Sequence, residues 1–361
     1  MKNAYYPHLF SKGKIGGCVI PNRVVLSPMD DTLGQASGEI SPRAIEYYAN
    51  KAKGGCGLVI VGYIAVVGPE LGGIAMSGET QLRSLNDRHA MSILAERVHE
   101  YGGKLFCQLN HPGRKTTPEY NQGHSPVSAT ALPSQMVGKT APCHELTIDE
   151  IHEIEEGFAN GAEHAFKAGA DGVEIHCGHH YLMCQFLNPV RNERTDEYGG
   201  SMENRCRIVV ETIEKIRERV PASFPVTCRI HLFDGEGYEG ENTVEDMIEI
   251  AKYLESKGVD GFNTTIGSVD RTGSPEMKAG WRNEYYKQFK AALNVPIYGP
   301  NEVKTPEEAE QFLAEGVYDF QILGRQQSAD PEWANKAKAG RSEDIRPCIS
   351  CNYCLYRVTA E

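Results

Sequence analysis

The 361-residue chain has no long apolar run and no excess of basic residues. Its amino-terminal stretch, MKNAYYPHLFSKGKIGG, is interrupted by Pro, Lys and Gly, so it resembles neither a signal peptide nor a membrane span. We therefore expect a cytoplasmic protein without a membrane partner. The net charge of −12 and the lack of a Lys- and Arg-rich run argue against nucleic-acid binding, which leaves small-molecule chemistry.

The chain has 11 cysteines, but a large protein without a signal sequence is not expected to use them for disulfides. Most lie in or beside apolar stretches, which predicts buried thiols. Examples are Cys18, Cys56, Cys107 and Cys228. A closely spaced group near the carboxyl end differs from these and has the pattern of metal ligands.

Eight short runs rich in Val, Ile and Leu alternate with longer amphipathic stretches, a pattern typical of parallel strands joined by crossover helices. The runs span residues 24–29, 57–62, 104–109, 171–176, 225–231, 260–266, 295–299 and 319–324. Eight strands indicate an α/β fold of the (β/α)8 TIM-barrel type, with an amino-terminal cap and a short Cys-rich tail. An open, doubly wound sheet is the alternative.

Signals at the ends of the amphipathic stretches support one repeating unit. Five junctions carry a glycine a few residues before the next strand, as helix ends often do. Three stretches begin with a capping pattern: Thr147 with Glu150, Thr243 with Asp246, and Thr305 before Pro306 and Glu308.

The segment EIHCGHHYLMCQFLNPVRNERTDEYGG (174–200) is the richest in chemical groups. His176, His179 and Tyr181 follow a predicted strand, so two imidazoles and a phenol can converge at the carboxyl end of the barrel. A Zn site built from His176, Cys177, His179 and His180 is an equal alternative on these residues alone. A polar strand end with hydrogen-bonded histidines is the interpretation without a function.

Five motifs in order resemble the old yellow enzyme family of NADH:flavin oxidoreductases, over about residues 8–346. They are NRVVLSPM (22–29), QLNHPGR (108–114), the two histidines and tyrosine with QFLNP (176–189), RTDEYGGS with ENR (194–205), and LGR with DPE (323–332). The resemblance implies that residues 1–346 form an FMN-binding TIM-barrel catalytic domain.

The resemblance further implies that His176 and His179 bind a substrate carbonyl oxygen and that Tyr181 donates a proton. Donors aimed at an oxygen that gains negative charge stabilise the transition state, and a well-placed phenol can complete the addition. These roles suit an ene-reductase, in which reduced FMN passes hydride to the C=C bond of an α,β-unsaturated carbonyl compound. NAD(P)H is then the electron source, and no metal is required.

The flavin contacts follow from the same resemblance. It places Pro28, Met29 and Gly62 at the ring, Gln108 at the pyrimidine edge, and Arg229 near N1 and O2, where a cation favours the reduced anionic flavin. The phosphate belongs to the loops after strands seven and eight. The residues implied there are Gly299, Asn301, Gly324 and Arg325.

Two positions near the flavin depart from the family pattern. Asn301 stands where the family usually has a second phosphate-loop glycine, and we expect Asn to tolerate a positive φ there. Asp30, followed by Asp31, stands where other members often have Thr or Cys. A carboxylate at Asp30 is expected to oppose electron uptake by the flavin.

The tail, residues 347–361, is a third departure. Cys348, Cys351 and Cys354 are spaced as ligands of a 4Fe-4S cluster, with a Zn knuckle as the alternative. The tail resembles the cluster segment of larger family members, including 2-enoate reductase, 2,4-dienoyl-CoA reductase and trimethylamine dehydrogenase. In those enzymes a fourth Cys follows after a longer gap. We therefore expect the fourth ligand outside this chain, in a longer protein that carries a carboxyl-terminal FAD and NAD(H) domain; a homo-oligomer is the other expected partner.

Two further functions compete with the ene-reductase. The cysteine spacing also suggests an amine dehydrogenase, but Trp281 and Trp333 are too few for an aromatic cage around an alkylammonium. No Cys lies between Cys18 and Cys56, where the amine enzymes attach FMN. A barrel that has lost catalysis and acts as a scaffold is the third candidate, and the intact histidine and tyrosine set argues against it.

One glycine pattern has a different explanation. Gly235, Gly237 and Gly240 match the spacing of a dinucleotide fingerprint. The acidic residues around them would repel a pyrophosphate, so we interpret the segment as a surface loop.

Overall fold

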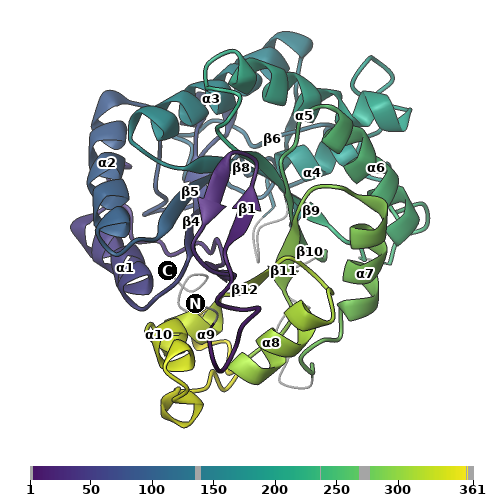
Figure 1. The fold of residues 1–361 in the computed structure, drawn as a ribbon. Coiled ribbons are helices and arrows are strands. Elements are labelled where there is room, and N and C mark those ends of the chain that lie inside the picture. Colours follow the sequence, from purple (N-terminus) through teal and green to yellow (C-terminus); the bar gives the residue numbers. More distant parts are fainter. Residues whose placement is uncertain (1–2, 135–139, 236, 268–276, 355, 357–361) are drawn as a thin grey trace.

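The computed structural model describes residues 3–134, 140–235, 237–267, 277–354 and 356. Eight parallel strands close into a barrel surrounded by helices (Figure 1), which confirms the predicted TIM barrel and excludes the open sheet. Around the barrel the strands are β3 (Val24–Leu26), β4 (Leu58–Ala65), β5 (Lys104–Asn110), β8 (Gly172–Cys177), β9 (Val226–His231), β10 (Phe262–Thr265), β11 (Ile297–Pro300) and β12 (Phe320–Leu323). Each of the eight predicted runs overlaps one of them.

The helices follow the strands in the order that the alternation predicts. The longer ones are α1 (Pro42–Lys53), α2 (Leu85–Glu100), α3 (Ile148–Lys167), α5 (Met202–Arg217), α6 (Val244–Ser256), α7 (Asn283–Ala292) and α8 (Pro306–Ala314). Shorter ones are α4 (Leu182–Leu187), α9 (Arg325–Ala329), α10 (Trp333–Lys338) and the 3-10 turns η1 (Pro69–Leu71) and η3 (Ser342–Asp344). No helix among the described residues is long and apolar enough to cross a membrane.

The predicted helix boundaries are confirmed at both ends. Capping boxes begin α3, α6 and α8 at Thr147, Thr243 and Thr305. At the five helix-to-strand junctions a glycine takes a left-handed φ, which has no steric cost for a residue without a Cβ. These glycines are Gly55 (94°), Gly102 (75°), Gly169 (90°), Gly258 (100°) and Gly316 (68°).

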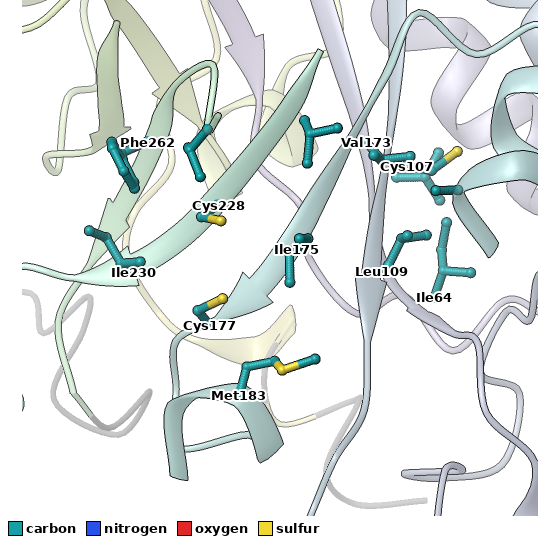
Figure 2. Packing of buried hydrophobic residues seen from close by; sticks show 14 of the residues in the cluster. Ile64, Cys107, Leu109, Val173, Ile175, Cys177, Met183, Cys228, Ile230 and Phe262 are labelled. Carbon is teal, nitrogen blue, oxygen red and sulfur yellow. The ribbon is translucent and has the colours of Figure 1, made fainter. Parts of the chain in front are cut away.

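Apolar side chains of the barrel strands alternate between two cores, as the period of two along a strand requires. Outward-facing residues of the wall pack beneath the helices. Figure 2 shows this layer, with Cys107, Cys177 and Cys228 among Val173 and Ile175. The four cysteines predicted to be buried thiols are indeed buried.

An antiparallel hairpin, β1 (Gly13–Ile15) and β2 (Cys18–Ile20), closes the amino end of the barrel. Its Ile15 and Ile20 are fully buried and join Phe106, Tyr298 and Phe320 in the inner core. Figure 1 shows this purple hairpin across the middle of the barrel. Two short strands, β6 (Val127–Ser128) and β7 (His144–Glu145), pair within the loop after β5. The opposite, carboxyl end of the barrel holds the polar side chains.

Candidate active site

Polar side chains fill the interior of the barrel toward its carboxyl end. Alternation along β8 and β9 turns Glu174 and His176, and Thr227 and Arg229, inward in paired register. The buried Glu174 carboxylate accepts hydrogen bonds from Gln108 Nε2 at 2.7 Å and from an asparagine of β10 at 3.0 Å. Burial raises the pKa of Glu174, whereas Arg229 and these amides oppose the rise. This hydrogen-bonded network of Glu174, Gln108 and the β10 asparagine, with Arg229 beside it, forms the floor of the site.

His176, His179 and Tyr181 converge above this floor. The ring centroid of His176 lies 5.2 Å from that of His179 and 4.9 Å from that of Tyr181. Both imidazoles are buried, and Tyr181 is the N-cap residue of α4. The structure therefore brings together the three residues that were predicted as the catalytic set.

Hydrogen bonds assign the protons of the two imidazoles. The backbone N–H of Gly178 donates to His176 Nδ1 at 3.2 Å, so the His176 proton lies on Nε2. That nitrogen is 3.3 Å from His179 Nδ1, and His179 Nε2 is 2.9 Å from Thr265 Oγ1. Burial, with the charge of Arg229, lowers the pKa of both imidazoles well below the usual range, so both are neutral donors.

Tyr63, which the sequence analysis did not select, lies against Tyr181. Their ring centroids are 4.8 Å apart, and the hydroxyl of Tyr63 influences that of Tyr181. Tyr63 takes a left-handed φ of 64° at an irregularity in the pairing of β4 with β5, between Val61 and Ile64. Such a bulge re-aims a side chain. Burial raises the pKa of Tyr181 and the neighbouring hydroxyl of Tyr63 lowers it, with a net rise.

Two buried carboxyl groups face this pair of tyrosines. Asp30 Oδ1 accepts from the backbone N–H of Thr32 at 3.1 Å, and Glu79 Oε2 accepts from the N–H of Ala75 at 2.6 Å. The second oxygen of each carboxyl group is buried and has no hydrogen-bond partner among the described residues. Burial raises the pKa of Asp30 to about 7, and burial with the charge of Asp30 raises the pKa of Glu79 well above its usual value.

The segment after β3 packs closely on β4. A Cβ added at Gly62 would lie 2.4 Å from the backbone N of Met29, so only glycine permits this approach. Pro28 is buried, and its carbonyl oxygen accepts from Arg229 Nη1 at 3.0 Å. Pro28, Met29, Gly62, Gln108 and Arg229 thus adjoin one another at the carboxyl end of the barrel.

The predicted phosphate residues lie at the ends of β11 and β12. A Cβ at Gly324 would lie 3.0 Å from Met29 Sδ, and one at Gly299 would lie 2.3 Å from the hydroxyl of Tyr286. Arg325 donates to Glu302 Oε2 and to Asn352 Oδ1, both at 2.7 Å. The guanidinium therefore contacts a carboxylate and the Cys-rich tail.

The structure differs from the prediction at Asn301. The left-handed residue of this loop is Glu302, with φ 54°, and not Asn301. Asn301 instead uses its side chain to hold the preceding loop: Oδ1 accepts from the N–H of Arg282 at 3.1 Å, and Nδ2 donates to Asn283 Oδ1 at 2.7 Å. These bonds hold the Asn301 side chain against Arg282 and Asn283, and the left-handed turn falls on the next residue, Glu302.

The donor set suits a flavin. Arg229 is buried, and its Nε has no hydrogen-bond partner within the described residues, so one guanidinium N–H remains for an acceptor. Gln108 adds an amide beside it. A buried unpaired donor is costly unless a bound group satisfies it. These two side chains are suited to carbonyl oxygens and ring nitrogens.

Metal-ligating side chains of the described residues gather at two places, and neither is a predicted metal site. One group is His180, Cys184 and His231; the other is His152, Glu155 and Glu211. Cys177 lies near Cys228 in the wall of the barrel (Figure 2), and it follows His176 in β8, so the two side chains point to opposite faces of the strand. The predicted zinc ligands His176, Cys177, His179 and His180 therefore do not form one ligand group among the described residues. Cys348 is half-buried and Cys351 and Cys354 are exposed, and these three sulfurs do not form one ligand group. Residues 355 and 357–361 of the tail lie outside the described residues.

Comparison with known proteins assigns nearly the whole chain to one family. Residues 8–344 match the model of the NADH:flavin oxidoreductase / NADH oxidase family. The chain belongs to this family. It is 41% identical over 354 residues to an NADH oxidase of Thermoanaerobacter brockii, covering 96% of this chain and 53% of that protein. It is 35% identical to a cinnamate reductase of Clostridium sporogenes, covering 96% and 55%.

Solved structures of the family resemble the fold closely. A 2-naphthoyl-CoA reductase in complex with 2-naphthoyl-CoA matches with a TM-score of 0.92 and 30% identity, covering 98% of this chain and 56% of that one. Histamine dehydrogenase from Rhizobium sp. 4-9 matches with a TM-score of 0.88 and 25% identity, covering 97% and 50%. The chain spans about half the length of these relatives. It is an oxidoreductase barrel, as the motifs predicted.

Sequence analysis missed several residues of the site. Tyr63 lies at an irregularity within β4 and Glu79 lies in the loop before α2, and neither belongs to a motif. His231 ends β9 on the inward face that Arg229 shares, so the period of two along residues 225–231 was a signal for it. Asp234, which contacts His231, follows three residues later.

Proposed function

We propose that this chain is the catalytic barrel of an FMN-dependent ene-reductase that acts on α,β-unsaturated carbonyl compounds. The observation that carries the proposal is the convergence of His176, His179 and Tyr181, with ring centroids 4.9–6.3 Å apart, at the carboxyl end of a flavin-family barrel. The similarity to a cinnamate reductase supports the same class of substrate.

The residues that would hold FMN are those at the ends of β3, β4, β5, β9, β11 and β12. Arg229 and Gln108 would face the polar edge of the ring, and Arg325 would face the phosphate. When bound, FMN supplies the hydride for the β-carbon, and NAD(P)H is the source of its electrons. Arg325 would have to exchange its contact with Glu302 for the phosphate.

The two imidazoles would bind the carbonyl oxygen of the substrate. His176 carries its proton on Nε2, and in the structure this N–H donates to His179 Nδ1 at 3.3 Å. A carbonyl oxygen that takes the place of this contact would accept from His176 Nε2, and also from His179 Nδ1 once Thr265 Oγ1 donates to His179 Nε2. Neutral donors aimed at an oxygen that gains negative charge stabilise the transition state.

Tyr181 would deliver the proton that completes the addition at the α-carbon. Its raised pKa keeps the phenol protonated at neutral pH. The neighbouring hydroxyl of Tyr63 lowers the pKa of Tyr181 and so would lower the cost of the phenolate that forms. This assigns binding to the two histidines and proton transfer to the tyrosine.

Amine oxidation is the second candidate, because the fold is similar to that of histamine dehydrogenase. The two candidates differ in the direction of electron transfer: an ene-reductase passes electrons from reduced flavin to the substrate, whereas an amine dehydrogenase takes electrons from the substrate into oxidised flavin. We would load the purified chain with FMN, photoreduce it without oxygen, and mix it with cinnamate or a simple enone. Reoxidation of the flavin is expected. No reoxidation by any enone, with bleaching of the oxidised protein by an amine, would overturn the ene-reductase in favour of the dehydrogenase.

We propose further that Cys348, Cys351 and Cys354 supply three thiolates to a 4Fe-4S cluster whose fourth ligand lies outside this set. Each iron of such a cluster needs a protein ligand, so three thiols alone should hold the cluster weakly. After anaerobic reconstitution, iron and sulfide analysis of the desalted chain should show fewer than four irons, and Cys351→Ser should lower the count. Four stably bound irons would contradict the need for an outside ligand.

A further inference from the structure

The loop that carries the second histidine of the pair has an uncommon backbone. His179 and His180 both take left-handed φ values, 53° and 58°, between β8 and α4. Two successive non-glycine residues in this region need contacts that hold them there. The direction of the His179 ring depends on those contacts.

One hydrogen bond from the barrel wall holds His179 in this conformation. The backbone N–H of His179 donates to Nε2 of His231 at 2.7 Å, and both groups are buried. His231 is the last residue of β9, so its ring is fixed to the barrel wall. The hydrogen bond therefore ties the turn of His179 to a rigid strand.

The tautomer of His231 follows from its partners. A backbone N–H can only donate, so Nε2 of His231 must accept, and its proton lies on Nδ1. That nitrogen is 3.0 Å from Asp234 Oδ1. The other oxygen of Asp234 accepts from Asn188 Nδ2 at 2.9 Å and from the N–H of Asn242 at 3.0 Å. The buried carboxylate is held on both sides.

Opposing influences act on the pKa of His231. Burial lowers its pKa, whereas Cys184 and Asp234 raise it, to about 10. A second proton on Nε2 would nevertheless face the amide proton of His179 at 2.7 Å. Two donors at that distance repel, so the turn as it stands requires the neutral, Nδ1-protonated form.

The same bonds argue against a metal ion at His180, Cys184 and His231, although their ligand atoms lie within 4.8 Å of one another. A ligating imidazole offers an unprotonated nitrogen. In His231 that nitrogen already accepts from His179, and the other carries the proton shared with Asp234.

We propose that His231, oriented by Asp234, is a positioning residue that holds His179 in the geometry required to bind the substrate oxygen. The proposal rests on the proposed ene-reductase function. His231 touches no substrate in this account; it sets the backbone of His179 and, through it, the direction of the imidazole toward His176. Asp234 selects the tautomer of His231, as carboxylates often do for functional histidines.

A pair of conservative variants tests the positioning role. In Asp234→Asn, the amide oxygen must take the position of Oδ2, because Asn188 Nδ2 and the Asn242 N–H both donate there. The new NH2 group therefore faces His231 Nδ1. The imidazole proton then moves to Nε2 and opposes the His179 amide. We expect the limiting rate of flavin reoxidation by an enone to fall about 10- to 100-fold, less than the 10²–10³ typical for loss of an oxyanion donor. Flavin content and thermal midpoint should stay near the wild-type values.

The other variants separate positioning from packing. His231→Gln keeps an acceptor for the His179 amide and should retain most of the rate, whereas His231→Leu should lose it. Cys184→Ala is the matched control: its sulfur is 3.8 Å from His231 Nδ1, and its removal leaves the chain from Asp234 to His179 intact. An unchanged rate in both Asp234→Asn and His231→Leu would overturn the proposal.

A direct measurement does not depend on the substrate. Nitrogen-15 NMR of the imidazoles in the wild-type protein should show His231 neutral, with its proton on Nδ1, and Asp234→Asn should move that proton to Nε2. A proton on Nε2 in the wild type, or one bound zinc per chain that Cys184→Ala removes, would overturn the proposal. If no enone reoxidises the wild-type flavin, the proposed function fails, and the NMR result still decides the role of His231.

Discussion

At the scale of single residues, the hydroxyl of Tyr63 lies beside Tyr181, the proposed proton donor. Its presence lowers the pKa of Tyr181, which burial has raised. In Tyr63→Phe we expect flavin reoxidation by an enone to slow by roughly threefold to tenfold, a fraction of the 10²–10⁴ that a general acid contributes. Stopped-flow absorbance measures the rate. A wild-type rate in the variant would show that Tyr63 does not assist Tyr181.

Asp30 should make the flavin potential depend on pH. Its pKa of about 7 means that the side chain is largely neutral at pH 5.5 and largely charged at pH 8.5. A charged carboxylate near the ring opposes electron uptake, so Asp30→Asn should raise the midpoint potential at pH 8.5 and change it little at pH 5.5. Spectroelectrochemistry at the two pH values measures this. Equal potentials for both proteins at pH 8.5 would count against the role of Asp30.

The same residue should affect stability with a defined sign. The folded pKa of about 7 lies above the ordinary value of 3.8, so between these values the folded state holds a proton that the unfolded state releases. The contribution of Asp30 to stability is therefore present below about pH 4 and declines as pH rises through 7. The thermal midpoint of Asp30→Asn should exceed that of the wild type at pH 8 and match it at pH 4. A difference of the opposite sign would contradict the burial of this carboxyl group.

At the scale of elements, the close approach of β4 to the segment after β3 shapes the edge of the site that we propose holds the flavin ring. In Gly62→Ala the new methyl group would lie 2.4 Å from the backbone N of Met29, so one strand must shift. We expect a loss of about 1–3 kcal/mol in the free energy of unfolding and weaker flavin retention. Urea unfolding and the flavin-to-protein absorbance ratio measure the two effects.

Gly261→Ala is the matched control for that variant. It lies just before β10, and its added Cβ would meet neighbours no closer than 3.3 Å. It should retain its flavin. If Gly62→Ala and Gly261→Ala behave alike, the close approach at Gly62 does not shape the site.

The elements also show what local sequence can predict. The capping boxes at Thr147, Thr243 and Thr305 are read from four-residue patterns, because a cap depends only on its own first turn. The end of β4 was predicted at 62, but the strand continues to Ala65 through the irregularity at Tyr63. That continuation depends on pairing with β5, which a single run of residues does not reveal.

At the scale of the whole molecule, the repeat of strand and helix predicts the barrel, and the barrel predicts that the site lies at its carboxyl end. The resemblance of spaced motifs then selects the two histidines and Tyr181. Contacts between distant segments could not be predicted in this way. Asp30 and Glu79, and His179 and His231, come from different βα units and meet only after the barrel closes. The cap at the amino end was predicted, but its hairpin form and its packing on Phe106 and Phe320 depend on contacts between distant segments.

The central claim is that this barrel reduces an activated alkene with Tyr181 as the proton donor. The most direct test is single-turnover reoxidation of the photoreduced, FMN-loaded chain by cinnamate or an enone, in the wild type and in Tyr181→Phe. We predict rapid reoxidation with formation of the saturated product in the wild type, and a rate about 10²- to 10⁴-fold lower in the variant at equal flavin content. Equal rates in the two proteins, or no saturated product from the wild type, would contradict the account.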